Sequence, residues 1–346
     1  MLCILCFADV FGIGVWADLQ GVQDPALRDL ASHLPAMALR SRQSGTVNNY
    51  RYGWEKWRQW ASLYPEVNVF PANAIYVALY LYDIFLGSRT AAPVSLAYYS
   101  ISWAHKVAGI EDPTDVPLVK MIKEAAPRNL VGFSNKKEPV SIKMMNEIVA
   151  KFGKIDASLA DLRLVTMCLI AFAGFLRYQE VANLRCSDIV IRRSFMKMFV
   201  EQSKTDIHRT GAWVYVARTN NSTCPVSAMI RYMDLAKCSV LSDMFLFRGI
   251  TRHKVVKSRS LRSKNTPLAY TTARSLMLNA LTSLGYDCSL FGTHSLRAGG
   301  ASAAASHRIE DRLFKKHGRW LSDRSKDRYV HEDLAQKLLV SQNLGL

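Results

Sequence analysis

A histidine and an arginine three residues apart are the clearest candidates for binding an anion in this sequence. His294 and Arg297 stand in FGTHSLRAGGASAAA, where their spacing places both on one face of a helix predicted to begin near Thr293. The helix continues through Gly, Ala and Ser, so its body can pack very closely against a neighbour. A helix start and a guanidinium suit an oxyanion. A histidine satisfied within the core explains His294 equally well if this segment is taken alone.

Three further segments each hold one unusual element. In AGFLRYQEVANLRCSDI, Arg177 directly follows an apolar helix and Glu180 stands three residues on, which a structural ion pair also explains. Lys204 lies in SKTD, at a strand end where a lysine usually faces solvent. In HGRWLSDRSKDRYVHEDL, Trp320 and Tyr329 are nine residues apart in a polar, basic context, and both could also anchor a terminal helix.

Taken together, these segments resemble the tyrosine recombinase (integrase) family, from about residue 24 to the end of the chain. Ala298 departs from the commoner bacterial pattern, in which a histidine or polar residue often follows the second arginine. The matching positions are Arg177 and Glu180 in a Gly-Leu-Arg-x-x-Glu-type segment, Asp188 in the Leu-Arg-Cys-Ser-Asp that follows, Lys204 in a Ser-Lys-Thr setting, His294 and Arg297 in the His-x-x-Arg box, Trp320 at the His-or-Trp position and Tyr329 at the nucleophile.

The resemblance implies an enzyme that exchanges DNA strands, a recombinase or integrase, without a metal or nucleotide cofactor. Tyr329 would attack a DNA phosphodiester, forming a 3′-phosphotyrosine and releasing a 5′-hydroxyl that later reseals the strand. His294 would assist proton transfer from the phenol, and Lys204 would protonate the departing 5′ oxygen as general acid.

The remaining matched residues would bind and orient the phosphate. Arg177 and Arg297 could each donate two hydrogen bonds to its non-bridging oxygens. Trp320 replaces the commoner histidine, so it would act as an N–H donor or packing group and less as an acid or base. Glu180 and Asp188 would support the site by positioning Arg177.

The resemblance leaves alternatives open. A type IB topoisomerase-like enzyme would relax DNA with the same site but without synapsis, and a domesticated DNA-binding protein would have lost recombination. The Gly-Arg-Trp form, with a basic stretch before Tyr329, is most similar to recombinases of eukaryotic mobile elements such as DIRS-type retrotransposons and cryptons. A nuclear location would follow from that likeness, with KVVKSRSLRSK as a candidate localisation segment.

The elements that must position these residues are expected to be mainly helical with a small β-hairpin. Composition predicts an unassigned leader at 1–23, a helical domain at 24–131, a linker at 132–141 and an α+β domain at 142–346. The resemblance implies that the helical domain is a core-binding (SAM-like) domain and that the α+β domain is a tyrosine recombinase catalytic domain.

Local patterns place several of these elements more closely. Thr46 is the predicted N-cap of a helix whose stripe of Tyr50, Trp54 and Trp57 favours a core face. Alternation in SFMKMFVEQ and GAWVYVAR predicts the two strands of the hairpin.

The charge balance favours a polyanionic partner. Lys and Arg total 45 against 28 Asp and Glu, a net charge of +17. No acidic residue lies between Asp243 and Asp287, although a solvated loop also explains this interval. The candidate DNA-binding residues are Arg51, Lys56 and Arg58 in the first domain, and Lys254, Lys257, Arg259, Arg262 and Lys264 in the second.

The remaining expectations concern location and assembly. Seven scattered cysteines fit a reducing intracellular compartment, and the absence of an unbroken apolar stretch of ~20 residues predicts no membrane span. We expect double-stranded DNA as partner and a homo-oligomer, a tetramer on synapsed sites. The apolar tail LAQKLLVSQNLGL would either dock on a neighbouring subunit or fold back on its own domain.

Overall fold

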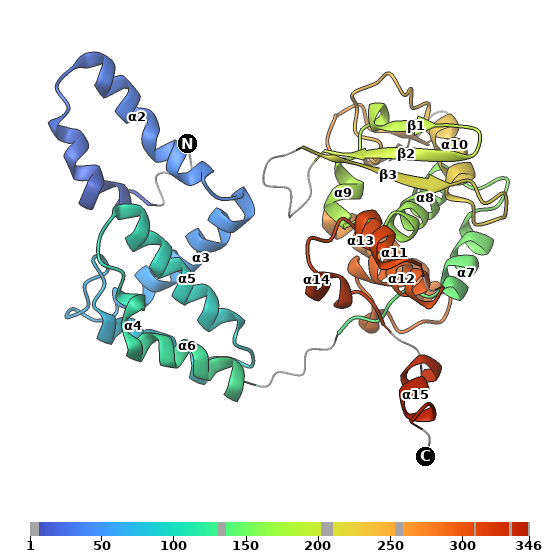
Figure 1. Cartoon of the computed structure of the whole chain (residues 1–346). Helices are drawn as coiled ribbons and strands as arrows, with labels where there is room; N and C mark the ends of the chain where they lie inside the picture. Colours follow the sequence, from blue (N-terminus) through green and yellow to red (C-terminus); the bar gives the residue numbers. More distant parts are fainter. Residues whose placement is uncertain are drawn as a thin grey trace. The chain divides into compact units, whose positions relative to one another are not determined.

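A computed structural model describes residues 7–130, 136–201, 210–252, 259–307, 309–331 and 334–344. The chain divides into two compact units, Met1–Ser134 and Asn135–Leu346 (Figure 1). Both are mostly helical, and the strands form small antiparallel sheets, which confirms the predicted fold class. Within the described ranges, no helix has the length and apolar character needed to cross a bilayer.

The first unit is a helical bundle. Trp54 and Trp57 are fully buried, as the core stripe predicts. The helix that carries them begins at Ser44 after Gln43, so Thr46 lies inside it and the predicted N-cap was wrong. The helices of the first unit are η1 (Val10–Gly12), η2 (Gly14–Gly21), α2 (Pro25–Arg40), α3 (Ser44–Ala61), α4 (Ala74–Gly87), α5 (Ala92–Ala108), η3 (Pro113–Asp115) and α6 (Pro117–Asn129).

A close helix–helix contact and a buried N-terminal segment contribute to the packing of this bundle. Helices α3 and α5 lie side by side (Figure 1), and a Cβ added at Gly53 would sit 2.2 Å from the Ser100 hydroxyl oxygen. Phe7 and Val10, from the segment left unassigned in the sequence, are fully buried in the same core. The described part of that segment is therefore folded against the first unit.

The second unit surrounds the central helix α8, most of which is buried. Val140 is also fully buried and its N–H donates to the Ser295 carbonyl at 2.9 Å, so part of the expected linker packs on this unit. Its helices are α7 (Ile142–Phe152), α8 (Leu159–Ala173), α9 (Tyr178–Asn183), η4 (Cys186–Asp188), α10 (Pro225–Ala236), α11 (Tyr270–Ser283), η5 (Cys288–Leu290), α12 (His294–Ser306), α13 (Asp311–Gly318), α14 (Asp323–Asp327) and α15 (Leu334–Gln342).

The strands form two sheets. The predicted hairpin is confirmed as β2 (Phe195–Val200) and β3 (Ala212–Ala217), and β1 (Ile189–Ile191) completes a three-stranded antiparallel sheet in the order β1-β2-β3. A second pair, β4 (Ile250–Arg252) and β5 (Arg259–Leu261), lies in the acid-free interval and was not predicted.

Helix α12 packs against α8 at very short range. A Cβ at Gly300 would lie 2.0 Å from the Phe172 carbonyl oxygen, and one at Gly299 would lie 2.0 Å from that of Val140. This confirms the predicted close packing of a helix made of small residues. The first turn of α12, with His294 and Arg297, is thereby held beside the end of α8, after which Arg177 follows.

Candidate active site

Arg297 lies at the centre of the site and is fully buried. Its guanidinium donates to the Phe175 carbonyl through Nη1 and to the Gly318 carbonyl through Nη2, the latter at 2.7 Å. Burial lowers the pKa of Arg297 to about 10, and the neighbouring charges of Arg177 and Arg319 act in the same direction. At neutral pH the group therefore keeps its positive charge.

Glu180 joins the two predicted arginines. Its Oε1 accepts from Arg177 Nη1 at 2.7 Å, and its Oε2 accepts from the Arg177 backbone N–H at 2.8 Å. Oε2 also lies 3.7 Å from Arg297 Nη1. The Glu180 side chain is only 2% exposed, and as the third residue of α9 it fixes the start of that helix beside Arg177.

Arg319 is a third guanidinium in this cluster, which the sequence analysis did not select. Its Nη2 donates to Glu180 Oε2 at 2.7 Å, and its side chain is 9% exposed. Its backbone is left-handed, with φ 54° at the C-cap of α13. The sequence feature that could have indicated Arg319 is its place between Gly318 and Trp320. The Gly-Arg-Trp sequence was interpreted only as a likeness to recombinases of eukaryotic mobile elements.

Aromatic rings cover the other side of Arg297. Its guanidinium carbon lies 4.9 Å from the ring centroid of Trp320 and 4.9 Å from that of Tyr329. Tyr329 lies 5.8 Å from Trp320 and 6.3 Å from His294, measured between ring centroids. Among the described residues, the buried Trp320 Nε1 has no hydrogen-bond partner, so a donor is available here.

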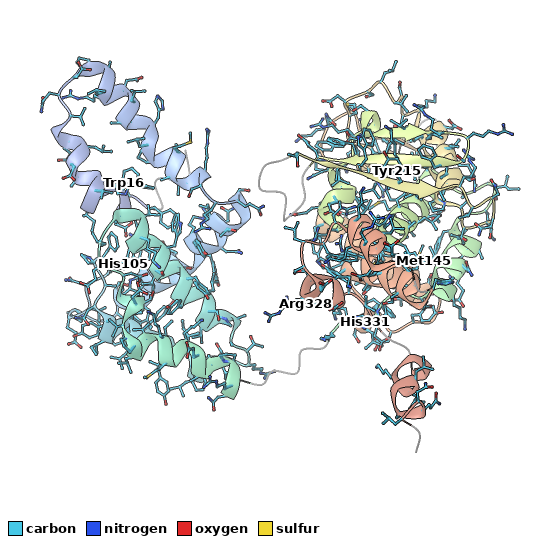
Figure 2. The ribbon with its side chains drawn as sticks, viewed as in Figure 1. Trp16, His105, Met145, Tyr215, Arg328 and His331 are labelled. Carbon is cyan, nitrogen blue, oxygen red and sulfur yellow. The ribbon has the colours of Figure 1, made fainter. Side chains whose placement is uncertain are left out.

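The segment that carries Tyr329 is tied to the rest of the unit. Ser302 Oγ on α12 donates to the Tyr329 carbonyl at 3.3 Å and accepts from the His331 N–H at 2.8 Å. Lys326 on α14 pairs with Asp311 on α13. Arg328 and His331, which flank Tyr329, can be located in Figure 2.

The structure thus brings together five of the six residues matched to catalysis: Arg177, His294, Arg297, Trp320 and Tyr329. Lys204 lies outside the described residues, as do Lys254 and Lys257. Within the described ranges no group of three His, Cys, Asp or Glu side chains is placed to hold a metal ion.

Asp188 does not have the contact expected of it. Its carboxylate accepts from the Arg185 backbone N–H at 2.7 Å, and burial raises its pKa. It therefore caps the short η4 turn, and the described contacts to the Arg177 guanidinium come from Glu180. The expectation that Asp188 positions Arg177 was wrong in this respect.

The candidate DNA-binding residues of the first unit differ in their surroundings. Arg58 is paired with Asp9 at 3.7 Å and Glu55 at 3.6 Å, while Lys56 is exposed and Arg51 is half-buried.

In the second unit, Arg259, Arg262 and Lys264 are exposed. Arg248, from the same basic interval, is buried and its carbonyl accepts from Arg163 at 2.7 Å, so that arginine belongs to the core.

The chain is similar in sequence to a known recombinase. No family model matches the chain. The integrase/recombinase xerD homolog of Selenomonas ruminantium is 24% identical over 297 residues, which are 85% of this chain and 83% of that protein.

Solved structures show the same fold. The XerH site-specific recombinase bound to palindromic difH substrate aligns with a TM-score of 0.62 at 12% identity, over 99% of this chain and 94% of its own. The lambda integrase tetramer bound to a Holliday junction aligns with a TM-score of 0.56 at 15% identity, over 87% of this chain and 76% of its own. The fold is therefore that of the tyrosine recombinases, and the sequence is similar to that of an integrase/recombinase over most of the chain.

Proposed function

We propose that this chain is a site-specific DNA recombinase or integrase whose nucleophile is Tyr329. The observation that carries the proposal is the position of the Tyr329 ring 4.9 Å from the Arg297 guanidinium carbon, in a cluster that also holds Arg177 and Trp320. These residues come from three separate segments of the sequence, and a structural role for each one separately does not explain why they converge.

The chemistry of the matched side chains supports a reaction in two reversible steps. The Tyr329 hydroxyl gives up its proton, which we assign to His294, and its oxygen forms a bond to phosphorus while the bond to the 5′ oxygen breaks. The 5′-hydroxyl leaves with a proton that we assign to Lys204. Arg177, Arg297 and the Trp320 N–H stabilise the charge that grows on the non-bridging oxygens. The reverse attack by a 5′-hydroxyl reseals the strand, and the phosphotyrosine conserves the bond energy.

A nicked suicide duplex tests the nucleophile. After cleavage the short fragment diffuses away, so a covalent protein–DNA adduct accumulates with the wild type and is detected as a shifted band. The Tyr329→Phe variant keeps the ring beside Arg297 and Trp320 but lacks the hydroxyl, and we expect no adduct. Tyr215→Phe, at an exposed tyrosine of β3, is the matched control. An adduct with Tyr329→Phe would assign the nucleophile to another residue.

The two alternative functions are less well supported. A domesticated protein has no need to retain Arg177, Arg297, Trp320 and Tyr329 in one cluster, and the sequence likeness is to a recombinase and not to a relaxing enzyme. Mapping products from a plasmid with two sites and measuring relaxation of a plasmid without a site would separate recombination from topoisomerase activity.

We further propose duplex DNA and a homo-oligomer as the working assembly. In α15, Leu338 is 42% exposed and Leu339 is 47% exposed, which supports docking of this tail on a neighbouring copy. Removal of residues 334–346 should leave single-site cleavage measurable but abolish recombination between two sites. Unchanged recombination would show that the tail is not required for assembly.

The origin of the chain is a separate proposal. The Gly318-Arg319-Trp320 sequence supports a kinship with recombinases of eukaryotic mobile elements of the DIRS or crypton type, and hence a nuclear location. A fluorescent fusion with and without substitutions in residues 254–264 tests the location, and cytoplasmic fluorescence of the unaltered fusion would contradict it.

A further inference from the structure

We propose that Arg319 is a positioning residue of the phosphate site, which acts through Glu180 to keep Arg177 and Arg297 available to the scissile phosphate. The inference rests on the proposed chemistry of Tyr329. It adds a third guanidinium, next to the two that the family resemblance implies.

The first support is the way in which the Glu180 carboxylate is shared. Oε1 binds Arg177 Nη1, while Oε2 binds both the Arg177 backbone N–H and Arg319 Nη2, each within 2.8 Å. Arg297 Nη1 remains 3.7 Å from Oε2, too far for a hydrogen bond. Arg319 therefore fills the acceptor that Arg297 would otherwise take, and Arg297 stays against the Tyr329 and Trp320 rings.

The second support is the charge of the cluster. Three guanidiniums and one carboxylate leave a net charge of two positive units, and without Arg319 only one would remain. A phosphodiester carries one negative charge, and attack by a deprotonated phenol adds a second in the transition state. With Arg319, the two positive charges of the cluster balance the two negative charges of the transition state. Stabilising the transition state in this way accelerates the reaction.

The third support is the backbone that carries Arg319. The residue has φ 54° where α13 ends, a conformation for which glycine is the usual choice. Its other terminal nitrogen, Nη1, lies 3.5 Å from the Gly174 and His317 carbonyl oxygens. The left-handed backbone of Arg319 costs conformational free energy, and the side chain is hydrogen-bonded to two segments. We infer that the side chain has a function that outweighs this cost.

The left-handed backbone also provides a clean variant. Arg319→Gly removes the guanidinium while relieving the strain, so the melting temperature should stay close to that of the wild type. We expect adduct formation on the suicide duplex to slow by about tenfold, less than the roughly hundredfold loss for a donor that touches the reacting oxygen. Arg319→Lys, which retains the charge, should recover part of the rate. Arg312→Gln, which removes a charge on the outside of α13, is the control.

A second substrate separates charge positioning from a purely structural role. A methylphosphonate at the scissile position lacks one negative oxygen, so the site then needs less positive charge. The rate ratio between wild type and Arg319→Gly should therefore be clearly smaller on the methylphosphonate than on the phosphodiester, whereas a structural defect would slow both substrates equally.

The outcomes distinguish this inference from the function on which it rests. Absence of a Tyr329 adduct with the wild type overturns both. Adduct formation by the wild type with an equal rate for Arg319→Gly overturns only the role of Arg319. Equal rate ratios on the two substrates overturn it as well.

Discussion

At the scale of single residues, four charged side chains lie together with little exposure to water: Arg177, Glu180, Arg297 and Arg319. Buried charges are costly unless they are paired and hydrogen-bonded. Here the carboxylate of Glu180 is shared, and the guanidinium of Arg297 donates to one carbonyl just beyond the end of α8 and to the carbonyl of the last residue of α13. Helix C-termini carry partial negative charge, so two of them facing Arg297 further stabilise the cation.

Glu180→Gln tests this arrangement. The substitution keeps the shape but leaves three guanidiniums without a counter-charge, so the free energy of unfolding should fall by about 3–5 kcal/mol. Chemical denaturation of the full chain measures the change. Glu310→Gln is the control, because its partner Arg312 is 75% exposed and such surface pairs contribute about 0–1 kcal/mol. Equal losses in the two variants would contradict the assigned importance of the buried carboxylate.

His317 gives a prediction about pH. Its Nε2–H donates to the Ala173 carbonyl at 2.8 Å, and burial lowers the pKa of the ring, as do Arg319 and Arg297. The unfolded chain therefore binds a proton at a higher pH than the folded one does. The contribution of neutral His317 to stability is fully present above the ordinary pKa of 6.5 and is lost as the pH falls below it.

His317→Asn keeps an N–H donor but does not titrate, so it should show a weaker loss of unfolding free energy between pH 7.5 and pH 5.5 than the wild type. Other lowered histidines such as His105 are common to both proteins and cancel in the comparison. Parallel pH dependences of the two proteins would show that His317 is not the responsible group.

At the scale of elements, helix α12 organises the site because it contacts both the end of α8 and the Tyr329 segment. Its glycines allow the approach to α8, and Ser302 holds the backbone around Tyr329. The distance between Arg297 and Tyr329 therefore depends on how closely α12 packs against α8. Two substitutions on α12 should change the rate of adduct formation, although neither residue touches a reacting group.

Gly300→Ala should push α12 away from α8, because the new Cβ would meet the Phe172 carbonyl oxygen at 2.0 Å. Overpacking of this kind costs about 1–3 kcal/mol, and we expect adduct formation to fall with it. Gly292→Ala is the matched control, since its Cβ would meet only the Lys137 side chain at an ordinary 3.7 Å. A wild-type melting temperature for Gly300→Ala would refute the packing argument.

Ser302→Ala removes both hydrogen bonds to the Tyr329 segment and leaves the His331 N–H without its partner. The stability loss should be about 1 kcal/mol, whereas the rate of adduct formation should fall several-fold with little change in DNA affinity. Single-turnover cleavage and a binding titration measure the two effects. Ser306→Ala should match the wild type, because the described hydrogen bonds of its hydroxyl lie within its own helix region. An equal effect of the two substitutions would contradict the role assigned to Ser302.

At the scale of the whole molecule, the net charge of +17 determines how the chain meets DNA. Each phosphate neutralised by a lysine or arginine releases counterions, so affinity falls steeply with salt. The exposed Arg262 and Lys264 are suited to such contacts, whereas Arg58 is already paired with two acidic side chains.

A double variant with Arg262→Gln and Lys264→Gln should therefore lower the slope of log affinity against log salt by about 2, roughly one for each lost phosphate contact. Arg58→Gln should change the slope much less, because its carboxylate partners already neutralise part of its charge. The measurement is a salt titration of duplex binding by the full chain. A slope unaffected by the double variant would place the DNA contacts elsewhere.

Sequence patterns alone were sufficient for the elements whose contacts are local or simply periodic. They placed the β2-β3 hairpin, the buried stripe of Trp54 and Trp57, and the close-packed helix that begins with His294, because burial repeats with the period of each backbone. Tertiary structure alone decided which charges from distant segments meet. Arg319 reached Glu180 because contacts between distant segments depend on how α8, α12 and α13 pack, which local spacing does not encode.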